Sequence, residues 1–320
     1  MMNHLVAICL AYVIDLITGD PKSWPHPVRW MGALISFLEA RCNRGKHRKQ
    51  KGFMMLLIVI IIVALLACLL TIISYAVHPL VGITVEALLI STTISQKSLK
   101  EAALEVSRPL KEYNLPKARH KLSQIVGRDT ETLSEREVIR GTIETVAENT
   151  SDGITAPLFW SVIGGAPLAL VYRAVNTCDS MVGYKNEPYT EFGWASARLD
   201  DVLNWPVARL TALVTMVVMK PQETTFKRAL TILVRDAKKH NSPNSGWGEA
   251  SVAALLGIQL GGINYYHGKK SLAPYMGKPY RRMQTDDIVR TIVLMQRTVL
   301  LFVIMLVIGG MLCELAIAWF

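Results

Sequence analysis

Hydrophobic runs alternate with short polar blocks along this chain. Phe53 to Val77 contains twenty-five residues without a charged side chain, and Pro79 to Ser95 is a second apolar run with one acid, Glu86. A helix needs about twenty apolar residues to cross the hydrocarbon core of a bilayer. The two runs therefore predict a transmembrane hairpin over residues 53–96, and Thr298 to Phe320 predicts a last membrane span.

A central apolar run, Ile154 to Tyr172, differs from a simple membrane anchor. It contains no charged residue, but prolines and glycines interrupt it, and carboxylates and amides flank it on both sides. Irregular backbone at membrane depth is tolerated only where protein or water surrounds it. We therefore expect bent or re-entrant helices around a polar cavity, here and in the partner run that contains Pro206. The interrupting residues are Pro157, Gly164, Gly165 and Pro167.

The segment between the hairpin and the central run is charged and has apolar positions at helical spacing. This pattern predicts a small cytoplasmic helical insert over residues 97–153. Ser134 and Glu137 have the spacing of a capping box, which predicts that a helix begins there and runs toward Glu148. At the end of this helix, Ser151 or Asp152 is expected either to belong to the functional site or to cap the helix that follows.

Two further segments complete the predicted organisation. Three prolines and two glycines between Asp15 and Gly32 predict a structured loop instead of a helix. Ala250 to Gly262 is rich in small residues and too short to span, so we expect it to pack against other helices or to dip into the membrane and return. The expected fold is thus an all-α, multi-pass membrane bundle with five parts: an N-terminal apolar helix and polar loop (1–52), the hairpin (53–96), the insert (97–153), a membrane-embedded catalytic core (154–267), and a basic loop with a C-terminal span (268–320).

Composition supports a membrane protein and narrows its partners. A hydrophobic content of 51% with a mean hydropathy of +0.30 is too apolar for an ordinary soluble enzyme. The net charge of +10 comes from basic residues beside the spans, as in Arg41 to Lys51, so the positive-inside rule explains it without a nucleic-acid partner. The five cysteines form no CxxC pair, which argues against a disulfide framework and a thiolate metal site.

The polar blocks suggest chemistry on an anionic substrate. Arg173, Asn176 and Asp179 or Ser180 recur at three- and four-residue spacing, and Asp200 or Asp201 aligns with an amide, Asn204, on another helix. Carboxylate oxygens favour Mg²⁺, which keeps waters and is shared with substrate phosphates. The alternative is a helix end whose acids pair with Arg198 and Arg209. We predict four metal ligands, Asp152, Asp179, Asp200 and Asp201.

The remaining candidates come from the same polar blocks. Glu148 and His240 join the four aspartates as predicted catalytic residues, because a base is needed near the reacting groups. Standard P-loop, dinucleotide-binding, zinc-protease and serine-hydrolase motifs are absent. The predicted substrate-binding residues are Asp20, His26, Arg29, Asn149, Arg173, Asn176, Lys185, Arg198, Asn204, Asn244 and Glu249, of which Arg29, Arg173, Lys185 and Arg198 are expected to hold a phosphate.

Five blocks in this order closely resemble the CobD/CbiB family of cobalamin biosynthesis proteins: DLITGDPKSWPHPVRWMG, ENTSDGITAPLFW, YRAVNTCDSMVGYK, FGWASARLDDVLNWPVARL and HNSPNSGWGEA. The resemblance covers nearly the whole chain. It implies a multi-pass inner-membrane enzyme that joins a propionate carboxylate of adenosylcobyric acid to the amine of (R)-1-amino-2-propanol O-2-phosphate, giving adenosylcobinamide phosphate. It also implies a requirement for ATP, most simply through an acyl phosphate. The residue roles above are inferred from this sequence and not from the family.

The resemblance and the residues together set the expected partners. They are a corrinoid substrate, the phosphorylated amino alcohol, the lipid bilayer and other membrane enzymes of the late cobalamin pathway, with a homo-oligomer left open. All polar blocks must reach one side of the bilayer to form one amide bond, so we expect an active site open to the cytoplasm. One alternative is an inner-membrane signalling protein like AmpE, which the retention of every polar block disfavours. Another is an Asp-motif transferase, whose DDxxD and DxxDGxxAR patterns are absent.

Overall fold

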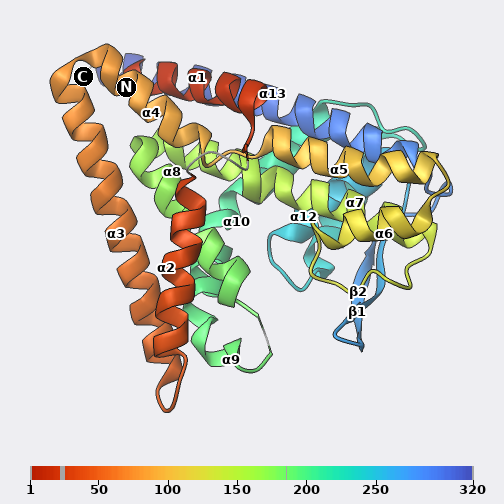
Figure 1. Ribbon diagram of the computed structural model, residues 1–320. Helices are drawn as coiled ribbons and strands as arrows, with labels where there is room; N and C mark the ends of the chain where they lie inside the picture. The colour runs from red at the N-terminus through yellow and green to blue at the C-terminus, as the bar shows by residue number, and fades with distance from the viewer. Residues whose placement is uncertain (1, 22–25, 185, 319–320) are drawn as a thin grey trace. The chain divides into compact units, whose positions relative to one another are not determined.

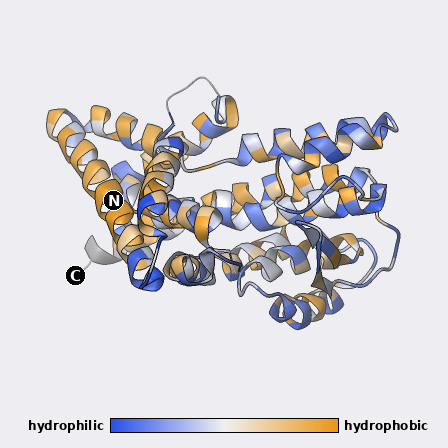
Figure 2. Cartoon of the chain, turned by 60° about the horizontal axis from the view of Figure 1, so that its bottom comes forward, coloured by the Kyte–Doolittle hydropathy of each residue, from blue (hydrophilic) through white to orange (hydrophobic). Residues whose placement is uncertain are grey.

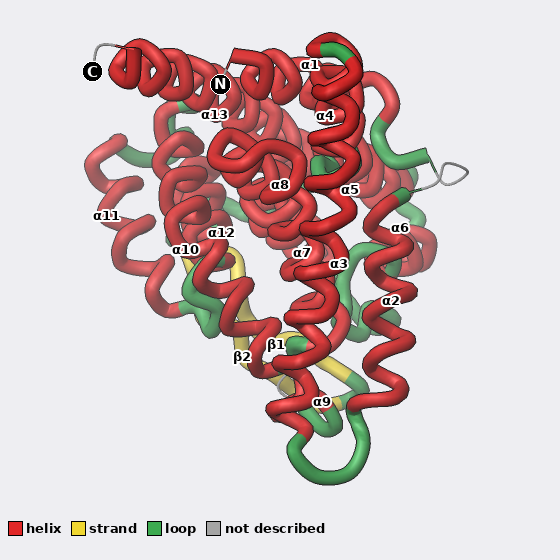
Figure 3. The backbone as a smooth tube through the Cα atoms, turned by 90° about the vertical axis from the view of Figure 1, so that its left-hand side faces the viewer, coloured by secondary structure: helices red, strands yellow, loops and turns green. Residues whose placement is uncertain are grey.

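The computed structural model describes residues 2–21, 26–184 and 186–318, and it is helical over most of that length (Figure 3). By packing, the chain divides into two compact units. The first consists of residues 1–97, 152–204 and 303–320, and the second of residues 98–151 and 205–302. The five-part division made along the sequence stays a prediction, whereas each packed unit joins segments that are far apart in the chain.

The first unit is built on the long helix α3, Arg48–Val77, which packs against α2, α4 and α8 (Figure 1). Its core contains Ile35, Met55, Val59 and Val175, all completely buried. These apolar side chains come from α2, α3 and α8, so the three helices share one hydrophobic core. The helices of this unit are α1 (Met2–Thr18), α2 (Pro27–Cys42), α3, α4 (Pro79–Ser91), α8 (Ala156–Val182), α9 (Tyr189–Phe192), the start of α10 (Trp194–Val217) and the end of α13 (Asp286–Ala318).

Among the described residues, five helical stretches are long and apolar enough to cross a membrane by length and composition. Figure 2 shows hydrophobic residues gathered on the helices at the left of the view, where Figure 1 labels α3 and α4. The prediction of a mostly helical, multi-pass membrane protein is confirmed at this level. The five stretches are Arg48–Val77, Pro79–Lys111, Glu135–Val182, Trp194–Val218 and Asp286–Leu315.

Helix α8 is broken in the middle of the central apolar run. Gly164 and Gly165 have non-helical backbone angles, and Gly165 lies in the left-handed region with φ +61°. The Tyr172 hydroxyl lies 3.0 Å from the carbonyl oxygen of Asp152. A straight helix would separate residues twenty positions apart by about 30 Å. The chain therefore folds back at the two glycines, which confirms the predicted bend; Pro206, in contrast, lies inside α10 without interrupting it.

A buried acid occupies the break in α8. Glu86 from α4 is completely buried and accepts hydrogen bonds from the Ala166 amide at 3.1 Å and the Tyr75 hydroxyl at 2.7 Å. Its carboxyl oxygens also lie 2.8 Å from Nδ1 of His4. Backbone N–H groups released by a helix break need a partner when no water is present. Glu86 supplies that partner at the start of the second half of α8.

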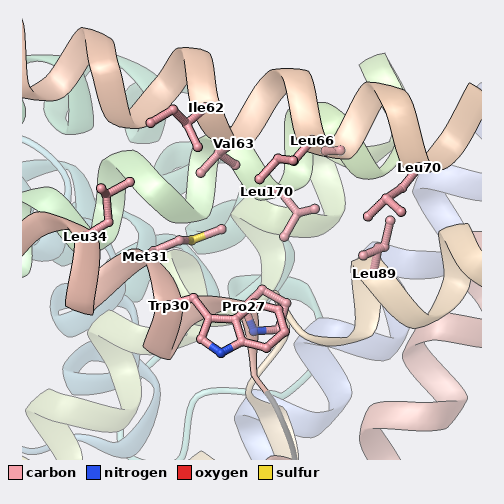
Figure 4. A pocket seen from close by; sticks show the side chains of 11 residues that line it. Pro27, Trp30, Met31, Leu34, Ile62, Val63, Leu66, Leu70, Leu89 and Leu170 are labelled. Carbon is pink, nitrogen blue, oxygen red and sulfur yellow. The ribbon is translucent and has the colours of Figure 1, made fainter.

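An apolar groove of about 180 Å³ lies on the surface of the first unit, between α2, α3 and α4 (Figure 4). Trp30 and Met31 come from α2, and Val63 and Leu66 from α3. Leu170 of α8 closes its floor. Since its walls are hydrophobic, it offers no groups for the polar chemistry expected from the sequence, and the candidate residues lie elsewhere.

The second unit contains the insert and a β-hairpin. The predicted capping box is confirmed: the Ser134 hydroxyl accepts from the Glu137 amide, and the Glu137 carboxylate accepts from the Ser134 amide at 2.7 Å. A π-helical turn, Ser151–Thr155, follows α7, so neither Ser151 nor Asp152 is the cap of a new helix. The elements of this unit are α5 (Gln96–Lys111), α6 (Leu115–Ser123), α7 (Glu135–Thr150), the rest of α10, α11 (Phe226–Asp236), α12 (Ser245–Leu256), β1 (Leu260–Tyr266), β2 (Lys269–Met276) and the first part of α13.

The expectation of an all-α fold is wrong for residues 257–276. Helix α12 ends at Gly257, and the antiparallel pair β1 and β2 follows. Gly261 and Gly262 have φ values of +83° and +113°, which a helix cannot accommodate. His267 and Gly268 both have positive φ, as the favoured two-residue hairpin turn requires. The small-residue segment therefore splits into a helix end and an edge of the hairpin.

The N-terminal loop is shorter than predicted. α1 continues to Thr18 and α2 begins at Pro27, so Arg29 lies in the first turn of a helix and not in a loop. Proline suits the first position of a helix, because that position has no intrahelical hydrogen bond to lose and its φ is already helical. Counting three prolines as helix breakers missed this role of Pro27.

Candidate functional site

Two polar clusters, one in each unit, contain seven of the seventeen predicted residues. We call the first the amide cluster; it comprises Tyr172, Arg173, Asn176, Asp200 and Asn204 of the first unit. We call the second the carboxylate cluster; it comprises Arg128, Arg140, Glu144, Glu148, His240, Ser245 and Glu249 of the second unit. Each is described by its own contacts.

The amide cluster is centred on Asp200, which is 7% exposed. Its two carboxylate oxygens accept hydrogen bonds from the side-chain amides of Asn176, at 3.1 Å, and Asn204, at 3.0 Å. The Arg173 guanidinium donates to the Asn176 carbonyl oxygen at 3.4 Å. The spacing of these residues in α8 and α10 predicted both same-helix pairs, and the structure confirms them.

Tyr172 completes the amide cluster and was not predicted. Its hydroxyl lies 2.8 Å from Oδ1 of Asn204 and 3.0 Å from the carbonyl oxygen of Asp152, and it is fully enclosed in the first unit. A buried hydroxyl needs a polar partner. The signal in the sequence was its position four residues before Asn176, at the end of an apolar run.

The four predicted metal ligands do not gather into one group. Among the described residues, no three His, Cys, Asp or Glu side chains are placed to hold a metal ion. Asp200 faces two amides, and Asp201 lies 3.9 Å from the guanidinium of Arg198, which is the helix-end pairing that the sequence left as an alternative. Asp179 packs over Gly183, where a Cβ would lie 1.9 Å from its Oδ1. A four-aspartate cage is therefore not formed, and magnesium binding stays a prediction.

The carboxylate cluster is organised by helix α7, which carries Arg140, Glu144 and Glu148 at four-residue spacing. Oε1 of Glu144 accepts from the Gly261 amide at 2.9 Å, and Oε2 lies 2.8 Å from the Arg128 guanidinium. Arg140 donates to the carbonyl oxygen of Gly261 and, at 2.9 Å, to Oδ1 of Asn264. The hydrogen bonds of Glu144 and Arg140 tie α7 to β1, the first strand of the hairpin. Sequence reasoning missed Arg128, which lies just before α7, and Asn264, which lies 124 positions beyond Arg140.

The other side of the carboxylate cluster contains the predicted His240 block. The Ser245 hydroxyl donates to Oε1 of Glu148 at 2.7 Å, and Nε2 of His240 lies 3.8 Å from Oε1 of Glu249. Burial raises the pKa of the Glu249 carboxyl well above its usual range, and repulsion from Glu144 and Glu148 adds to this shift. Glu249 therefore keeps its proton to a higher pH than an exposed glutamate does.

The remaining predicted residues lie apart from these cluster contacts. Asn149 donates to the Thr145 carbonyl oxygen of its own helix, and Asn244 stands at the start of α12, largely buried. In the first unit, His26 and Asp20 form a pair at 3.0 Å, and Arg29 donates to the Pro21 carbonyl oxygen at 3.1 Å. Asp20 and His26, two of the predicted substrate-binding residues, thus lie together. Lys185 lies outside the described residues.

Comparisons with known proteins agree over almost the full chain. A family model described as CobD/Cbib protein matches residues 8–295. The cobalamin biosynthesis protein CobD of Halalkalibacterium halodurans is 55% identical over 308 residues, which is 96% of this chain and 97% of that protein. The cobalamin biosynthesis protein CbiB of Salmonella paratyphi B is 48% identical over 91% of this chain and 92% of its own length. No solved structure matches. The chain belongs to the CobD/CbiB family of cobalamin biosynthesis proteins.

Proposed function

We propose that this protein is an adenosylcobinamide-phosphate synthase of the inner membrane. The observation that carries the proposal is the family match over nearly the whole chain to relatives named for cobalamin biosynthesis. The reaction is an amide ligation between adenosylcobyric acid and (R)-1-amino-2-propanol O-2-phosphate. Both substrates are anionic, and a chain that keeps guanidinium, amide and carboxyl groups within predominantly apolar segments suits such substrates.

The chemistry requires activation of a carboxylate. One oxygen of the propionate attacks the γ-phosphorus of ATP and releases ADP, which leaves an acyl phosphate. The amine nitrogen then attacks the acyl carbon, inorganic phosphate leaves, and the nitrogen loses one proton as the C–N bond forms. ATP would enter as a co-substrate in its magnesium complex, and the metal ion would neutralise charge on the phosphates.

Within the amide cluster, Arg173 is proposed to bind the phosphate of the amino alcohol. Its guanidinium already donates to Asn176, which in turn holds Asp200, so the cation is oriented by hydrogen bonds on one side. Arginine matches the geometry of phosphate oxygens better than a point charge does. Asp200 and Tyr172 position the amides through the contacts described above and are not assigned a reacting atom.

Within the carboxylate cluster, the proposed base is Glu148 or His240. Glu148 accepts from Ser245 at 2.7 Å, and Nε2 of His240 lies 3.8 Å from Oε1 of Glu249. A general base must reach the proton that it removes, directly or through one water.

The test is ligation by purified protein, with product measured by mass spectrometry in the presence and absence of ATP. Arg173→Gln should raise the KM for the phosphorylated amine by about tenfold or more, because a charged hydrogen bond contributes roughly 1.5–3 kcal/mol. Asp200→Asn should lower turnover to below about a tenth, because it changes the set of amide donors and acceptors. Lys46→Gln, in the exposed basic loop, is the control. Wild-type protein that consumes no adenosylcobyric acid with ATP present would overturn the proposal.

A further inference from the structure

A second concave surface in the second unit has no role in the clusters described above. It encloses about 640 Å³ and lies where the chain leaves the β-hairpin and enters α13. Arg281 and Arg282 line it from this connection, and Arg136 lines it from the first turn of α7. Pro279 and Tyr280 supply an apolar wall. The surface thus combines three guanidinium groups with an aromatic ring.

The acids near this surface are already engaged. Asp287 accepts from Arg281 at 2.6 Å and from Arg290 at 3.0 Å, so it neutralises groups of its own segment. Asp286 pairs with Lys111 at 2.8 Å, and Glu137 is held in the capping box of α7. The other acids beside the surface are Glu223, which lies 3.9 Å from Arg281, and Glu135, which accepts from the Thr285 hydroxyl at 3.5 Å.

Two of the three arginines are uncompensated. Within the part of the chain that the structure describes, Arg136 and Arg282 have no acidic partner within ion-pair distance, and both are exposed. Arg281 is different, because it also donates to the Leu256 carbonyl oxygen at 2.9 Å and forms part of the wall. Arg136 stands at a helix N-terminus, where the helix dipole adds to its attraction for an anion.

The surface continues beyond Arg136. A smaller depression of about 250 Å³ is lined by Arg136 and Arg140, together with Gly262 and Tyr275. Arg136 therefore has open space on two sides. An anion bound to it can contact residues of the hairpin and residues of the connection to α13. A single inorganic phosphate would fill only part of this space.

We infer that this surface binds the polyphosphate of a nucleotide. Arg136 and Arg282 pair with phosphate oxygens, which guanidinium groups bind with two parallel hydrogen bonds. The Tyr280 ring, 43% exposed, and Pro279 provide a face against which a base stacks. An anionic lipid headgroup shares the phosphate chemistry, but it would leave the aromatic wall unused. The inference rests on the proposed function in one respect: the ligation requires ATP, and this surface would be its binding site.

The test measures nucleotide binding without corrinoid or amine, so that it does not depend on ligation. Full-length protein in detergent is titrated with a fluorescent trinitrophenyl ATP, which is then displaced by ATP, AMP or inorganic phosphate. The double variant Arg136→Gln and Arg282→Gln should weaken ATP binding by about tenfold or more. Tyr280→Leu should weaken it without changing displacement by inorganic phosphate. The charge-matched control is Arg44→Gln with Lys46→Gln, in the exposed loop of the first unit.

Each outcome separates this site from the proposed function. If wild-type protein binds ATP through these residues but performs no ligation, the site stands and the proposed function fails. If wild-type protein ligates, yet the double variant binds ATP as tightly as the control, the site is refuted. If the double variant no longer binds vesicles of anionic lipid but binds ATP as tightly as wild type, the nucleotide assignment is also refuted. The phosphate that this surface binds would then belong to a lipid headgroup.

Discussion

Replacing Glu86 with leucine should destabilise the first unit, although the substitution makes a membrane helix more hydrophobic. The side chain is completely buried and has three hydrogen-bond partners from three segments: His4, Tyr75 and the Ala166 amide. Leucine fills a similar volume but accepts none of these bonds. The Ala166 amide would then be buried at the break of α8 without a partner.

The expected loss follows from the number of bonds. Interhelical hydrogen bonds in membrane proteins contribute about 0.6 kcal/mol on average and up to about 1.7 kcal/mol each. Three bonds therefore give a loss of about 2 to 5 kcal/mol for Glu86→Leu. Glu86→Gln retains one acceptor oxygen, so its loss should be smaller. The predicted order of stability is wild type, then Glu86→Gln, then Glu86→Leu.

The assay is the midpoint of thermal unfolding of purified protein in one detergent, followed by tryptophan fluorescence. Thr84→Val is the control, because this exposed residue of the same helix donates only to the Leu80 carbonyl oxygen. Glu86→Leu should unfold several degrees below the control. A Glu86→Leu midpoint equal to or above that of wild type would show that the break in α8 is satisfied without the carboxyl group.

Two further predictions concern other positions in the same assay. Gly165→Ala should unfold at a lower temperature than Gly309→Ala, because a Cβ at Gly165 would require a left-handed backbone and would lie 2.3 Å from Glu86 Oε1, whereas a Cβ at Gly309 has nothing within 4 Å; equal midpoints would contradict this. Because the pKa of Glu249 is raised in the folded state, folding binds a proton and the resulting stability is lost as pH rises from the unfolded pKa of about 4.3 through the folded value. The unfolding temperature of the wild-type protein should therefore decrease as the pH is raised from acidic to alkaline. Glu249→Gln should flatten this dependence, and identical pH profiles for the two proteins would refute the assignment.

Features that depend on one helix were predictable from the sequence. The capping box of Ser134 and Glu137 and the pairing of Asp200 with Asn204 both follow from three- or four-residue spacing, and the structure confirms them. The break of α8 followed from two adjacent glycines with a proline nearby. Such patterns record local geometry, which one segment of sequence contains in full.

Contacts between distant segments were not predictable in this way. Arg128 reaches Glu144, and Asn264 accepts from Arg140 although 124 positions separate the two residues. Periodicity says which face of α7 is polar but not which segment meets that face. The same limit explains the four-aspartate prediction: clustering along the sequence was taken for proximity in space, whereas Asp200 pairs with two amides and Asp201 lies beside a guanidinium.

The location of the polar loop between α8 and α10 relative to the membrane can now be argued from contacts within the first unit. Arg48 of α3 lies 3.1 Å from Glu187, and Lys49 lies over the Trp194 ring at 3.9 Å. Gly52 packs so closely that a Cβ there would lie 1.8 Å from the Phe192 carbonyl oxygen. The loop therefore lies beside the first turns of α3, next to the basic segment 41–51 (Figure 1).

This placement predicts a cytoplasmic loop. The basic segment is the strongest positive-inside signal in the chain, whereas His78, at the other end of α3, is separated from it by about 45 Å along a helix of 30 residues. In a cysteine-free protein in intact cells, single cysteines at Ser180 and Glu191 should behave like one at Lys46 and unlike one at His78; all four positions are exposed. The cysteines at Ser180, Glu191 and Lys46 should react with a permeant maleimide and resist an impermeant one. The impermeant reagent should label only His78→Cys. Labelling of Ser180→Cys and Glu191→Cys together with His78→Cys would place the loop outside and would contradict the contacts with α3.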